Sequence, residues 1–440
     1  MEASLMPMTA NNEENIQLLL QSGNDGTLFS ENRFLHLVES FGEIGKDPKG
    51  GVTRLAFSPE DITARRRIIA LMQDAYHLEV RVDAWGNIFG HRSGNGERAG
   101  VLLTGSHMDS VRNGGKFDGP AGVFCGLEMV RAFNELGIRT RHPIDVVVFT
   151  AEEPNHSGLS TIGSRGLASR LHLADLMNRV DDQGLPIPEA LRRVGGNPDL
   201  TTDSVLQPGQ IKAFIEVHIE QMKHLDAAGI DLGVVTGVAG IRRRRLVVHG
   251  EAGHGGSTPM VERRDALVAA SKIIRAAYRS AVESRGQAVA TIGHIETRPN
   301  AVNIIPGRVA LEMEIRSYME EEIERIDRRV WDAAQQTRET LGVEVERSAC
   351  VYDTQPRAFA PDIRAKLRRS CDLWDYSHQD LVSMAGHDAY HLSHISDAGM
   401  LFIPSAGGRS HCPEEWTDAI YLVKASQVLA TALLLLDKED

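Results

Sequence analysis

Histidine and carboxylate side chains of the kind that bind metal ions recur along this chain, each just after an apolar run. The candidates are His107, Asp118, the adjacent Glu152 and Glu153, His218 and His411. Two or three imidazoles together with carboxylates form the usual ligand set of hydrolytic zinc or manganese centres. A spare carboxylate beside the ligands can serve as the base for a metal-activated water. These residue types therefore predict a metallohydrolase.

Taken singly, each of these residues has an ordinary alternative. Asp118, in Gly-Gly-Lys-Phe-Asp-Gly-Pro, also fits a turn that caps a helix. His107 is more distinctive because Asp109 follows it, and a nearby carboxylate can fix the tautomer of a ligating imidazole. Glu152 and Glu153 would repel each other at a strand end unless a cation lies beside them. The combination of residues, more than any one of them, indicates a site.

The elements expected around these residues place them at one edge of a sheet. Near-continuous apolar strands are expected over residues 100–104, 144–150, 213–218 and 400–404, with an amphipathic helix over 121–136. Such strands separated by helices are typical of a largely parallel α/β sheet. Ligands gather outside the carboxyl ends of parallel strands, and the candidates at or beyond such ends are His107, Glu153, His218 and His411.

A segment with a different pattern interrupts this α/β chain. Strands are expected over residues 243–250, 288–296, 308–316 and 343–351, and helices over 263–282 and 320–341. The order β-α-β-β-α-β is that of a small ferredoxin-like domain. We therefore expect an α/β domain over residues 1–239 and 353–440, with 1–30 as a loose arm, and an inserted α+β domain over 240–352.

Composition limits the classes of protein that fit. A chain of 440 residues favours two domains. Its formal charge of −12, from 48 basic and 60 acidic residues, argues against nucleic acid as a partner. Four cysteines without a CxxC pair favour a reduced, cytoplasmic setting. No secretory signal and no membrane span are expected, since we find no apolar stretch of 18 residues.

Four motifs, found together and in order, resemble the hydantoinase/carbamoylase branch of the metal-dependent M20 amidohydrolase and peptidase family. They are Gly-Ser-His-Met-Asp-Ser at 105–110, Gly-Gly-Lys-Phe-Asp-Gly-Pro at 114–120, Val-His-Ile-Glu-Gln at 217–221 and Ser-His-Cys-Pro-Glu-Glu-Trp at 410–416. The resemblance covers about residues 30–435. It implies a zinc-exopeptidase-like catalytic domain with an inserted dimerisation or lid domain. The branch contains N-carbamoyl-L-amino acid hydrolases, β-ureidopropionases and allantoate amidohydrolases.

The resemblance implies two divalent metal ions per chain. His107, Asp118 and His218 would bind one ion, while Asp118, Glu153 and His411 would bind the other, so that Asp118 bridges them. Zinc is the expected metal, and mixed imidazole and carboxylate ligands also suit manganese, cobalt or nickel.

The resemblance also implies roles in the reaction. Glu152 would deprotonate the bridging water and then protonate the leaving nitrogen. His254, in Gly-His-Gly-Gly, would reach into a neighbouring subunit's site and stabilise the oxyanion, so a homodimer is expected. Asn303 and Arg316 would lie together and hold the substrate carboxylate. The further residues implied to line this pocket are Gln221 and His387.

Two segments beside the expected metals depart from the family pattern. After Glu153 the family usually continues Gly-Ser-Arg-Phe, whereas this chain has Pro-Asn-His-Ser at 154–157. After Gln221 it usually has Gly-Pro, and here Met-Lys follows. Asn155 and His156 are therefore candidate specificity residues, with an ordinary loop as the alternative for His156.

These observations predict an enzyme that hydrolyses an amide or ureido C–N bond in a small carboxylate-bearing molecule. An N-carbamoyl-L-amino acid is the leading substrate, and an allantoate-type ureide or an N-acyl amino acid is the alternative. A dipeptidase is disfavoured by the segment with Asn303 and Arg316. A non-catalytic metal-binding relative is disfavoured because such a protein has no need of Glu152.

Overall fold

The computed structural model describes residues 12–23, 26–96, 98–202, 204–350 and 352–438. The chain divides into two compact units. The main unit comprises the described residues up to 236 together with 359–381 and those from 387 onward. The inserted unit comprises 237–358 and 382–386.

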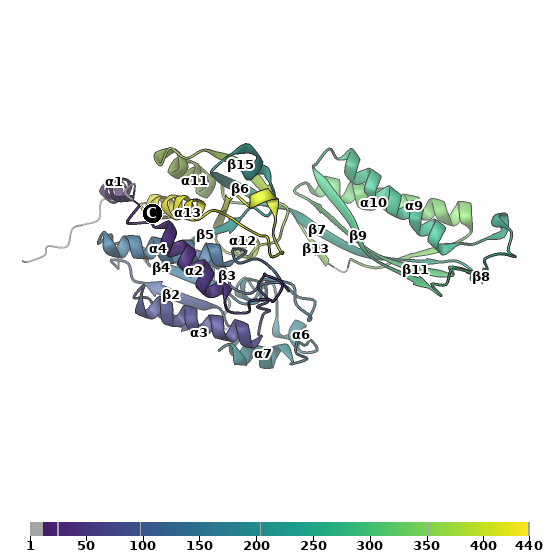
Figure 1. Cartoon of the computed structure of the whole chain (residues 1–440), viewed down its shortest axis with the longest axis horizontal. Helices are drawn as coiled ribbons and strands as arrows, with labels where there is room; N and C mark the ends of the chain where they lie inside the picture. The colour runs from purple at the N-terminus through teal and green to yellow at the C-terminus, as the bar shows by residue number, and fades with distance from the viewer. Residues whose placement is uncertain (1–11, 24–25, 97, 203, 351, 439–440) are drawn as a thin grey trace, which may run out of the picture. The chain divides into compact units, whose positions relative to one another are not determined.

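One mixed sheet of nine strands forms the frame of the main unit (Figure 1). In pairing order the strands are β1 (Glu79–Val82), β2 (Ile88–Arg92), β4 (Ile144–Phe149), β3 (Val101–His107), β5 (Ile211–Ile219), β16 (Asp397–Ile403), β6 (Leu232–Val238) and β14 (Arg357–Ala358), and β15 (His378–Ser383) also pairs with β6. The four central strands, β4, β3, β5 and β16, run parallel. The predicted largely parallel α/β class is confirmed.

Helices cover this sheet because their apolar residues match its buried strands. The longer helices are α2 (Glu31–Gly42), α3 (Pro59–Asp74), α4 (Pro120–Glu135), α11 (Pro361–Leu373) and α13 (Ala419–Asp437). The short ones are α5 (Ile162–Leu167), α6 (Leu173–Leu176), α7 (Ile187–Arg193), α8 (His224–Ala228), α12 (Asp388–Leu392) and the 3-10 turns η2 (Pro198–Leu200) and η4 (Ala406–Gly408). α4 packs on β3 and on α13, so its apolar residues are almost all buried.

α13 corrects one expectation from the sequence. Among the described residues it is the one helix long and apolar enough to cross a membrane, although no such stretch was expected. Yet 83% of its apolar window is buried inside the chain, where it contacts α1, α2, α4 and α11. Its composition is therefore accounted for by its place in the core.

The described part of the expected N-terminal arm is not loose. Residues 12–22 form α1 (Asn12–Ser22), whose Ile16 and Leu19 are buried against α13. The Asn12 amide donates to the Asp437 carboxylate at 3.1 Å and to the Leu434 carbonyl at 3.2 Å. The helix forms because its partners lie at the other end of the chain. Residues 1–11 lie outside the described residues.

The inserted unit has the predicted order β-α-β-β-α-β. Its antiparallel sheet pairs in the order β12 (Glu344–Arg347), β7 (Gly240–His249), β11 (Arg308–Ser317) and β9 (Ala288–Arg298), with β13 (Tyr352–Thr354) also on β7. The helices are α9 (Ala266–Glu283) and α10 (Glu320–Leu341), and smaller elements are β8 (Gly253–His254), η3 (Met260–Glu262) and β10 (Ile304–Ile305). The strand expected over 343–351 ends at Arg347, and β13 begins separately at Tyr352.

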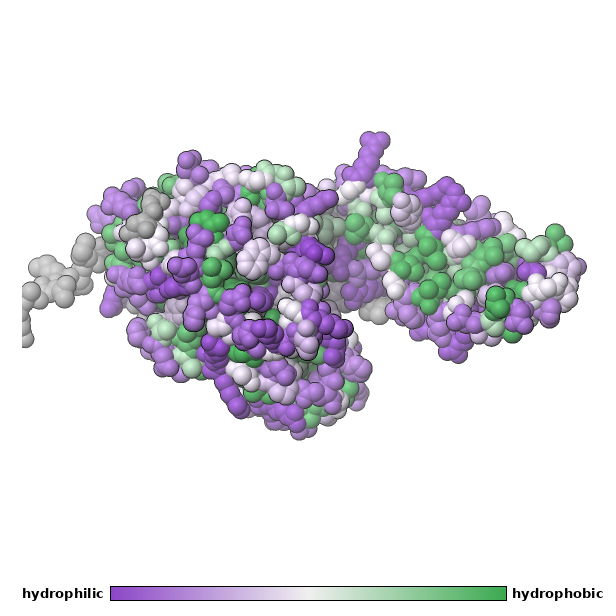
Figure 2. All heavy atoms as spheres, in the orientation of Figure 1, coloured by the Kyte–Doolittle hydropathy of each residue, from purple (hydrophilic) through white to green (hydrophobic). Residues whose placement is uncertain are grey.

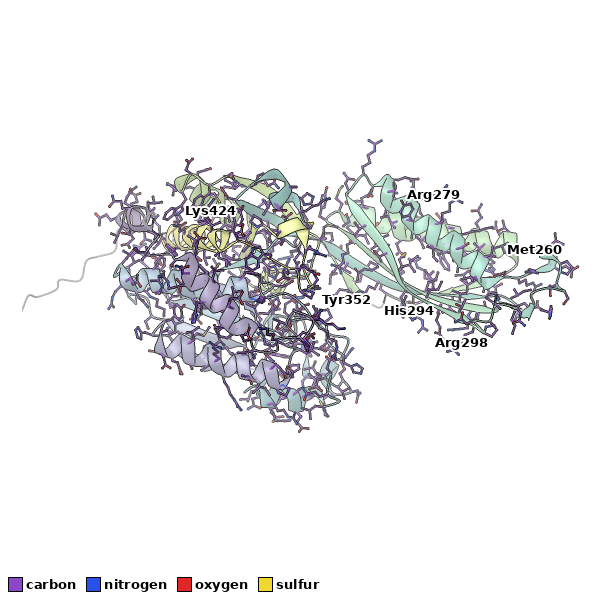
Figure 3. The ribbon with its side chains drawn as sticks, in the orientation of Figure 1. Met260, Arg279, His294, Arg298, Tyr352 and Lys424 are labelled. Carbon is purple, nitrogen blue, oxygen red and sulfur yellow. The ribbon has the colours of Figure 1, made fainter. Side chains whose placement is uncertain are left out.

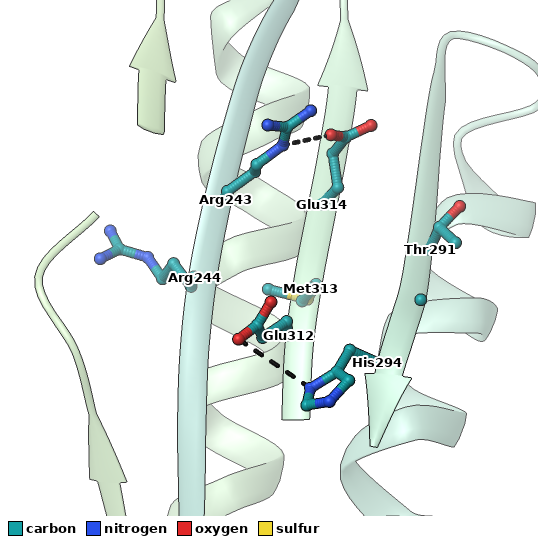
Figure 4. Close-up of a pocket in the computed structure, with 8 residues that line it drawn as sticks. Arg243, Arg244, Thr291, His294, Glu312, Met313 and Glu314 are labelled. Atoms are coloured by element: carbon teal, nitrogen blue, oxygen red, sulfur yellow. Dashed lines mark hydrogen bonds and ion pairs between the residues drawn. The ribbon is translucent and has the colours of Figure 1, made fainter. Parts of the chain in front are cut away.

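The two faces of this inserted sheet differ in character. Alternate residues such as Leu246, Leu311 and Ile315 are buried with α9 and α10 in one apolar cluster. On the opposite face a hollow of about 320 Å³ is lined by polar residues that include Arg243 and Glu314, whose side chains form an ion pair at 2.5 Å (Figure 4). Period-two alternation thus assigns one face to the core and leaves the other polar.

Candidate metal centre

The carboxyl ends of the parallel strands deliver the candidate ligands to one place. His107 is the last residue of β3, and His218 is the last but one of β5. Glu153 follows β4, and His411 follows β16. Asp118 lies two residues before α4, so the loop that enters this helix carries it into the same region. Neighbouring parallel strands end side by side, which is why residues far apart in sequence meet here.

Two groups of side chains that can hold metal ions share one carboxylate. The ligand atoms of His107, Asp118 and His218 all lie within 4.8 Å of one another, as do those of Asp118, Glu153 and His411. Asp118 Oδ1 lies 3.5 Å from His107 Nε2 and 3.2 Å from His218 Nε2. Its Oδ2 lies 3.3 Å from His411 Nε2. One oxygen therefore faces each group, as a bridging ligand requires.

The two imidazoles of the first group are oriented for metal binding. His107 Nδ1 lies 3.0 Å from the Asp109 carbonyl oxygen, and His218 Nδ1 lies 2.9 Å from the Ile219 carbonyl oxygen. A carbonyl can only accept, so each Nδ1 carries a proton, and each Nε2 faces Asp118 as the nitrogen that a cation could bind. This donor set fits divalent cations of the zinc and manganese type.

Asp109 acts differently from the sequence-based expectation. Its carboxylate lies 3.7 Å from His107 Nδ1, and the backbone carbonyl makes the closer contact described above. The carboxylate instead accepts the backbone N–H groups of Glu152 at 3.2 Å and of Glu153 at 3.0 Å. Asp109 therefore holds the turn that presents both acids. The residue before them, Ala151, has a φ of 52°, a conformation that such a turn requires.

Burial and opposite charge perturb the acids of this site in different directions. Burial acts against ionisation of Asp118, yet the neighbouring His218, His107 and His411 hold its pKa well below the usual range. Burial raises the pKa of Glu152 well above the ordinary value, and Glu153 and Asp388 raise it further while His107 opposes them. Hydrogen bonds to Asp118 and Glu153 raise the pKa of His411 to about 11. Perturbed groups gathered in this way are characteristic of functional sites.

Glu152 stands beside the ligands without belonging to either group. Its side chain is buried, and Oε2 lies 3.8 Å from His107 Nε2. Burial raises the pKa of this carboxyl, and a carboxyl with a raised pKa is suited to accept a proton and return it.

Two of the residues predicted to line the pocket lie at the same centre. Gln221 has a φ of 58°, and its Nε2 donates to Asp118 Oδ2 at 2.7 Å. The ring of His387 lies edge-on to that of His218, with 4.5 Å between centroids. Sequence reasoning missed Glu216, whose carboxylate lies with His218 and His387 in a third group. The alternation of Glu216 and His218 along β5 was an available signal, because residues two apart share a face.

The specificity candidates lie in the loop after Glu153. The Asn155 side-chain oxygen accepts the backbone N–H of Ser157 at 3.0 Å, which closes a turn within the loop. His156 is exposed, and its backbone N–H donates to Asp182 Oδ2 at 3.1 Å. His156 also lines a hollow of about 490 Å³ together with Asn178 and Arg179.

Three further predicted residues belong to the inserted unit, and they do not gather in one place. His254 and Asn303 are neighbours, because β8 pairs with β10 and the Gly255 N–H donates to the Asn303 carbonyl at 2.8 Å. Arg316 lies eight residues beyond Arg308 on β11, a span of about 26 Å in a strand. The expectation that Asn303 lies beside Arg316 is therefore wrong for a single chain.

Arg316 has its partners within the inserted unit. Its Nε donates to Glu314 Oε1 at 2.5 Å, and its Nη1 donates to the Met384 carbonyl at 2.9 Å. Glu314 also accepts from Arg243 at 2.5 Å. Within the described residues Arg316 Nη2 donates no hydrogen bond. This nitrogen is available to a further acceptor.

Comparison with known proteins identifies relatives with the same architecture. The pattern of Peptidase family M20/M25/M40 matches residues 103–435. The chain is 38% identical to N-carbamoyl-L-amino-acid amidohydrolase of Paenarthrobacter aurescens, over 88% of this chain and 94% of that one. It is 39% identical to the Geobacillus stearothermophilus enzyme of the same name, over 88% and 93%. It is 31% identical to allantoate amidohydrolase of Bacillus subtilis, over 88% and 93%.

Solved structures agree with these relatives. A hydantoinase/carbamoylase family amidase from Burkholderia multivorans has a TM-score of 0.85 and 33% identity, covering 93% of this chain and 98% of that one. The structure of AtUAH in complex with (S)-hydroxyglycine has a TM-score of 0.81 and 30% identity, with the same coverage. The chain therefore belongs to peptidase family M20/M25/M40, in its hydantoinase/carbamoylase branch.

Proposed function

We propose that this protein is a binuclear metal-dependent hydrolase that cleaves the ureido C–N bond of an N-carbamoyl-L-amino acid. One observation carries the proposal: Asp118 presents one oxygen to each ligand group, while the buried Glu152 stands beside them, outside both. We expect zinc as the metal, with manganese, cobalt or nickel as alternatives.

Different residues of the chain have different roles in the proposed reaction. Divalent cations held at this centre would supply a hydroxide at neutral pH and polarise the scissile carbonyl. Glu152 takes the proton from the attacking water and returns it to the leaving nitrogen, a task suited to a carboxyl whose pKa burial has raised. Asp109 holds the backbone of Glu152 and Glu153, which keeps the base and the ligand in fixed relation.

The substrate class rests on the relatives and on Arg316. N-carbamoyl-L-amino-acid amidohydrolases among the relatives are 33–39% identical, against 31–32% for the ureidoglycolate hydrolases and the allantoate amidohydrolase. Carboxylate-bearing ligands such as (S)-hydroxyglycine and glyoxylate occupy solved relatives. A guanidinium with a free terminal nitrogen suits such a carboxylate. Ureides such as allantoate and ureidoglycolate are the alternative, because enzymes of both names are relatives.

A substrate panel on metal-reloaded protein tests this function. Metal-free protein is loaded with zinc or manganese and assayed for ammonia or free amine on N-carbamoyl-L-amino acids, allantoate, ureidoglycolate and N-acetyl amino acids. We expect the highest kcat/KM on an N-carbamoyl-L-amino acid, loss of activity on chelation and recovery on metal addition. Full activity in metal-free protein would contradict the mechanism. A clear preference for a ureide would favour the alternative, and inactivity with both ions bound would favour a non-catalytic role.

We further propose a homodimer in which His254 and Asn303 act in the partner's site. Asn303, beside His254, lies before the start of β11, and Arg316 lies about 26 Å along β11 from Arg308, a span that a small substrate does not bridge. His254 Nδ1 accepts two backbone N–H groups, from Gly256 and Ser257, at 3.1 Å each. Its proton therefore sits on Nε2, as a donor to an oxyanion must have it. The end of the unit that carries His254 also exposes Met260 (Figure 3).

An apolar surface on the inserted unit supports this assembly. Leu267, Tyr278 and Val282 of α9 are 40%, 67% and 59% exposed, and recur at helical spacing. Val289 and Ile295 of the edge strand β9 are 48% and 49% exposed. Figure 2 shows apolar residues gathered over this unit. An exposed apolar face beside an unpaired strand edge fits a symmetric interface with a second copy.

Mixing two inactive variants tests the assembly. Glu152→Gln and His254→Ala chains are combined and allowed to exchange subunits. In a heterodimer the His254→Ala chain keeps its own Glu152 and receives His254 from its partner, so one of the two sites is intact. Random pairing should therefore recover about a quarter of wild-type activity. No recovery despite demonstrated exchange would mean that His254 does not act across subunits.

A further inference from the structure

We propose that Glu415 is a positioning residue of the metal centre, which holds the bridging ligand Asp118 and ties it to the loop that carries His411. The proposal deepens the function proposed above and rests on its metal centre. Glu415 is 4% exposed, so its carboxylate is directed into the protein although its neighbour Glu414 is exposed.

The Glu415 carboxylate contacts the Asp118 segment through both oxygens. Oε1 accepts the backbone N–H groups of Phe117 at 2.9 Å and of Asp118 at 3.0 Å. Oε2 lies 3.0 Å from the Ser410 hydroxyl, which donates to Asp118 Oδ2 at 2.6 Å. Asp118 is therefore held at its backbone by Glu415 and at its side chain by Ser410. Both residues belong to the loop of His411.

The packing around these contacts leaves little freedom. A Cβ added at Gly115 would lie 1.9 Å from Glu415 Oε1, so the loop backbone approaches the carboxylate more closely than a side chain would allow. The rings of Phe117 and Trp416 meet edge to face with 5.4 Å between centroids. The residues beside Asp118 and Glu415 thus pack together as well.

The metal centre needs such a tie because its second ligand group joins distant segments. Asp118 lies in a loop before α4, and His411 lies in a loop with a φ of 57° and a side chain that is 47% exposed. Neither loop is held by the sheet ladder. Without Glu415, the backbone of the Asp118 loop would lose its two hydrogen bonds to the His411 loop, and the side-chain contact from Ser410 would have to hold Asp118. Partners outside the ligand set that orient ligands in this way commonly affect metal affinity.

Metal titration of the full-length, metal-free chain tests the proposal. Zinc affinity is measured by competition with a chromophoric chelator for wild type, Glu415→Ala, Glu415→Gln and Gly115→Ala. The matched control is Glu414→Ala, which removes the same charge from the exposed neighbouring position. Thermal unfolding of each metal-free variant reports on the fold alone.

We expect Glu415→Ala to weaken zinc binding about 10–100-fold while Glu414→Ala stays within about twofold of wild type. Glu415→Gln keeps an oxygen that can accept the two backbone N–H groups, so it should recover part of the loss. Gly115→Ala should resemble Glu415→Ala, since the added methyl displaces the carboxylate without changing its charge.

Three results would overturn the proposal. The first is wild-type zinc affinity in folded Glu415→Ala or, if that variant does not fold, in Gly115→Ala. The second is an equal loss in Glu414→Ala. The third is a lower metal-free melting temperature with unchanged affinity. None of these measurements requires substrate. If the wild-type protein bound two ions but hydrolysed no substrate, the proposed function would be refuted, and the role of Glu415 could still be measured.

Discussion

The buried Asp327 of the inserted unit and the buried acids beside the metal centre of the main unit are compensated in opposite ways. In the inserted unit Asp327 of α10 is 4% exposed and surrounded by arginines: Arg244 lies at 2.8 Å, Arg347 at 2.5 Å and Arg242 at 3.7 Å. In the main unit Glu152 and Glu216 are also buried, yet neither has a lysine or arginine partner within the described part of the chain. The nearest cationic groups there are imidazoles that face the metal centre.

This contrast separates charges that serve the fold from charges that serve a ligand. A buried carboxylate that is paired with arginines of the same chain supports the fold, because its removal leaves those buried cations unpaired. A carboxylate whose pKa is raised by burial is unfavourable to ionise in the metal-free chain. A bound cation offsets this free-energy cost. We therefore expect substitutions in the two units to act on different measurements.

The largest expected effect is on the acids beside the metal centre. Glu152→Gln should lower kcat by about 100-fold to 10,000-fold, as loss of a general base does, with two ions still bound. Glu153→Gln should instead lose one ion, because Glu153 belongs to a ligand group. Metal analysis and steady-state kinetics on both variants check this. Identical behaviour of the two would remove the distinction between base and ligand.

Substitution of Arg316 tests whether a charged side chain of the inserted unit also binds a ligand. Arg316→Ala should lower kcat/KM by about 30-fold to several thousand-fold, the usual effect of removing one partner of a desolvated charge pair. Arg316→Lys should be nearly as damaging, since a point charge cannot reproduce the fork. The exposed Arg298 of β9 supplies the control, Arg298→Lys. A substrate analogue with a carboxamide should show little loss, and an equal loss on both substrates would assign Arg316 to the fold.

Asp327 should show the opposite pattern, with an effect on stability and none on metal content. Asp327→Ala leaves three arginines without their buried partner, and we expect it to lower the free energy of unfolding by about 3 kcal/mol. Asp332→Ala, on the exposed side of the same helix, is the control. Urea unfolding followed by tryptophan fluorescence measures the difference. A change in zinc affinity with unchanged stability would contradict the assignment of Asp327 to the fold.

The smallest expected effect is on the pH dependence of stability. Folding raises the pKa of Glu152, Glu216 and His218, so the folded metal-free chain binds more protons than the unfolded one. Its stability should fall as pH rises above the ordinary pKa values of these groups, 4.5 for glutamate and 6.5 for histidine, towards their raised values. Saturating zinc displaces these protons, so the loaded chain should show the reverse slope. Thermal unfolding with and without zinc checks both slopes, and equal slopes would mean that no cation compensates these acids.

Local pattern was sufficient for much of the fold. The helix predicted over 320–341 is α10 with both ends correct, because its acidic first turn and the glycine after Leu341 mark the boundaries. The parallel strands were predictable from continuous apolar runs, and strand ends from the polar residues that follow them. That rule placed His107, Glu153, His218 and His411 in one region of a sheet, whereas Asp118 reaches it from the loop before α4.

Tertiary structure decided which distant segments meet. α1 lies on α13 because Asn12 finds its partners at Asp437 and Leu434, and no local pattern encodes that pairing. Asn303 and Arg316 share a short stretch of sequence, yet Asn303 lies before β11, and β11 runs extended for about 26 Å from Arg308 to Arg316.

The metal centre shows the same division between sequence and structure. Residue types and positions were enough to single out His107, Asp118 and His411 as candidate ligands, because imidazoles and carboxylates gathered near the carboxyl ends of parallel strands suit a metal site. In the sequence, Glu415 cannot be distinguished from the adjacent Glu414, because both are glutamates in the same segment. Only the approach of two loops, almost three hundred residues apart, places its oxygen on the backbone of Asp118. The sequence determines the chemical groups and the local conformation of each segment. Packing determines which distant segments come into contact, and therefore which of these groups interact.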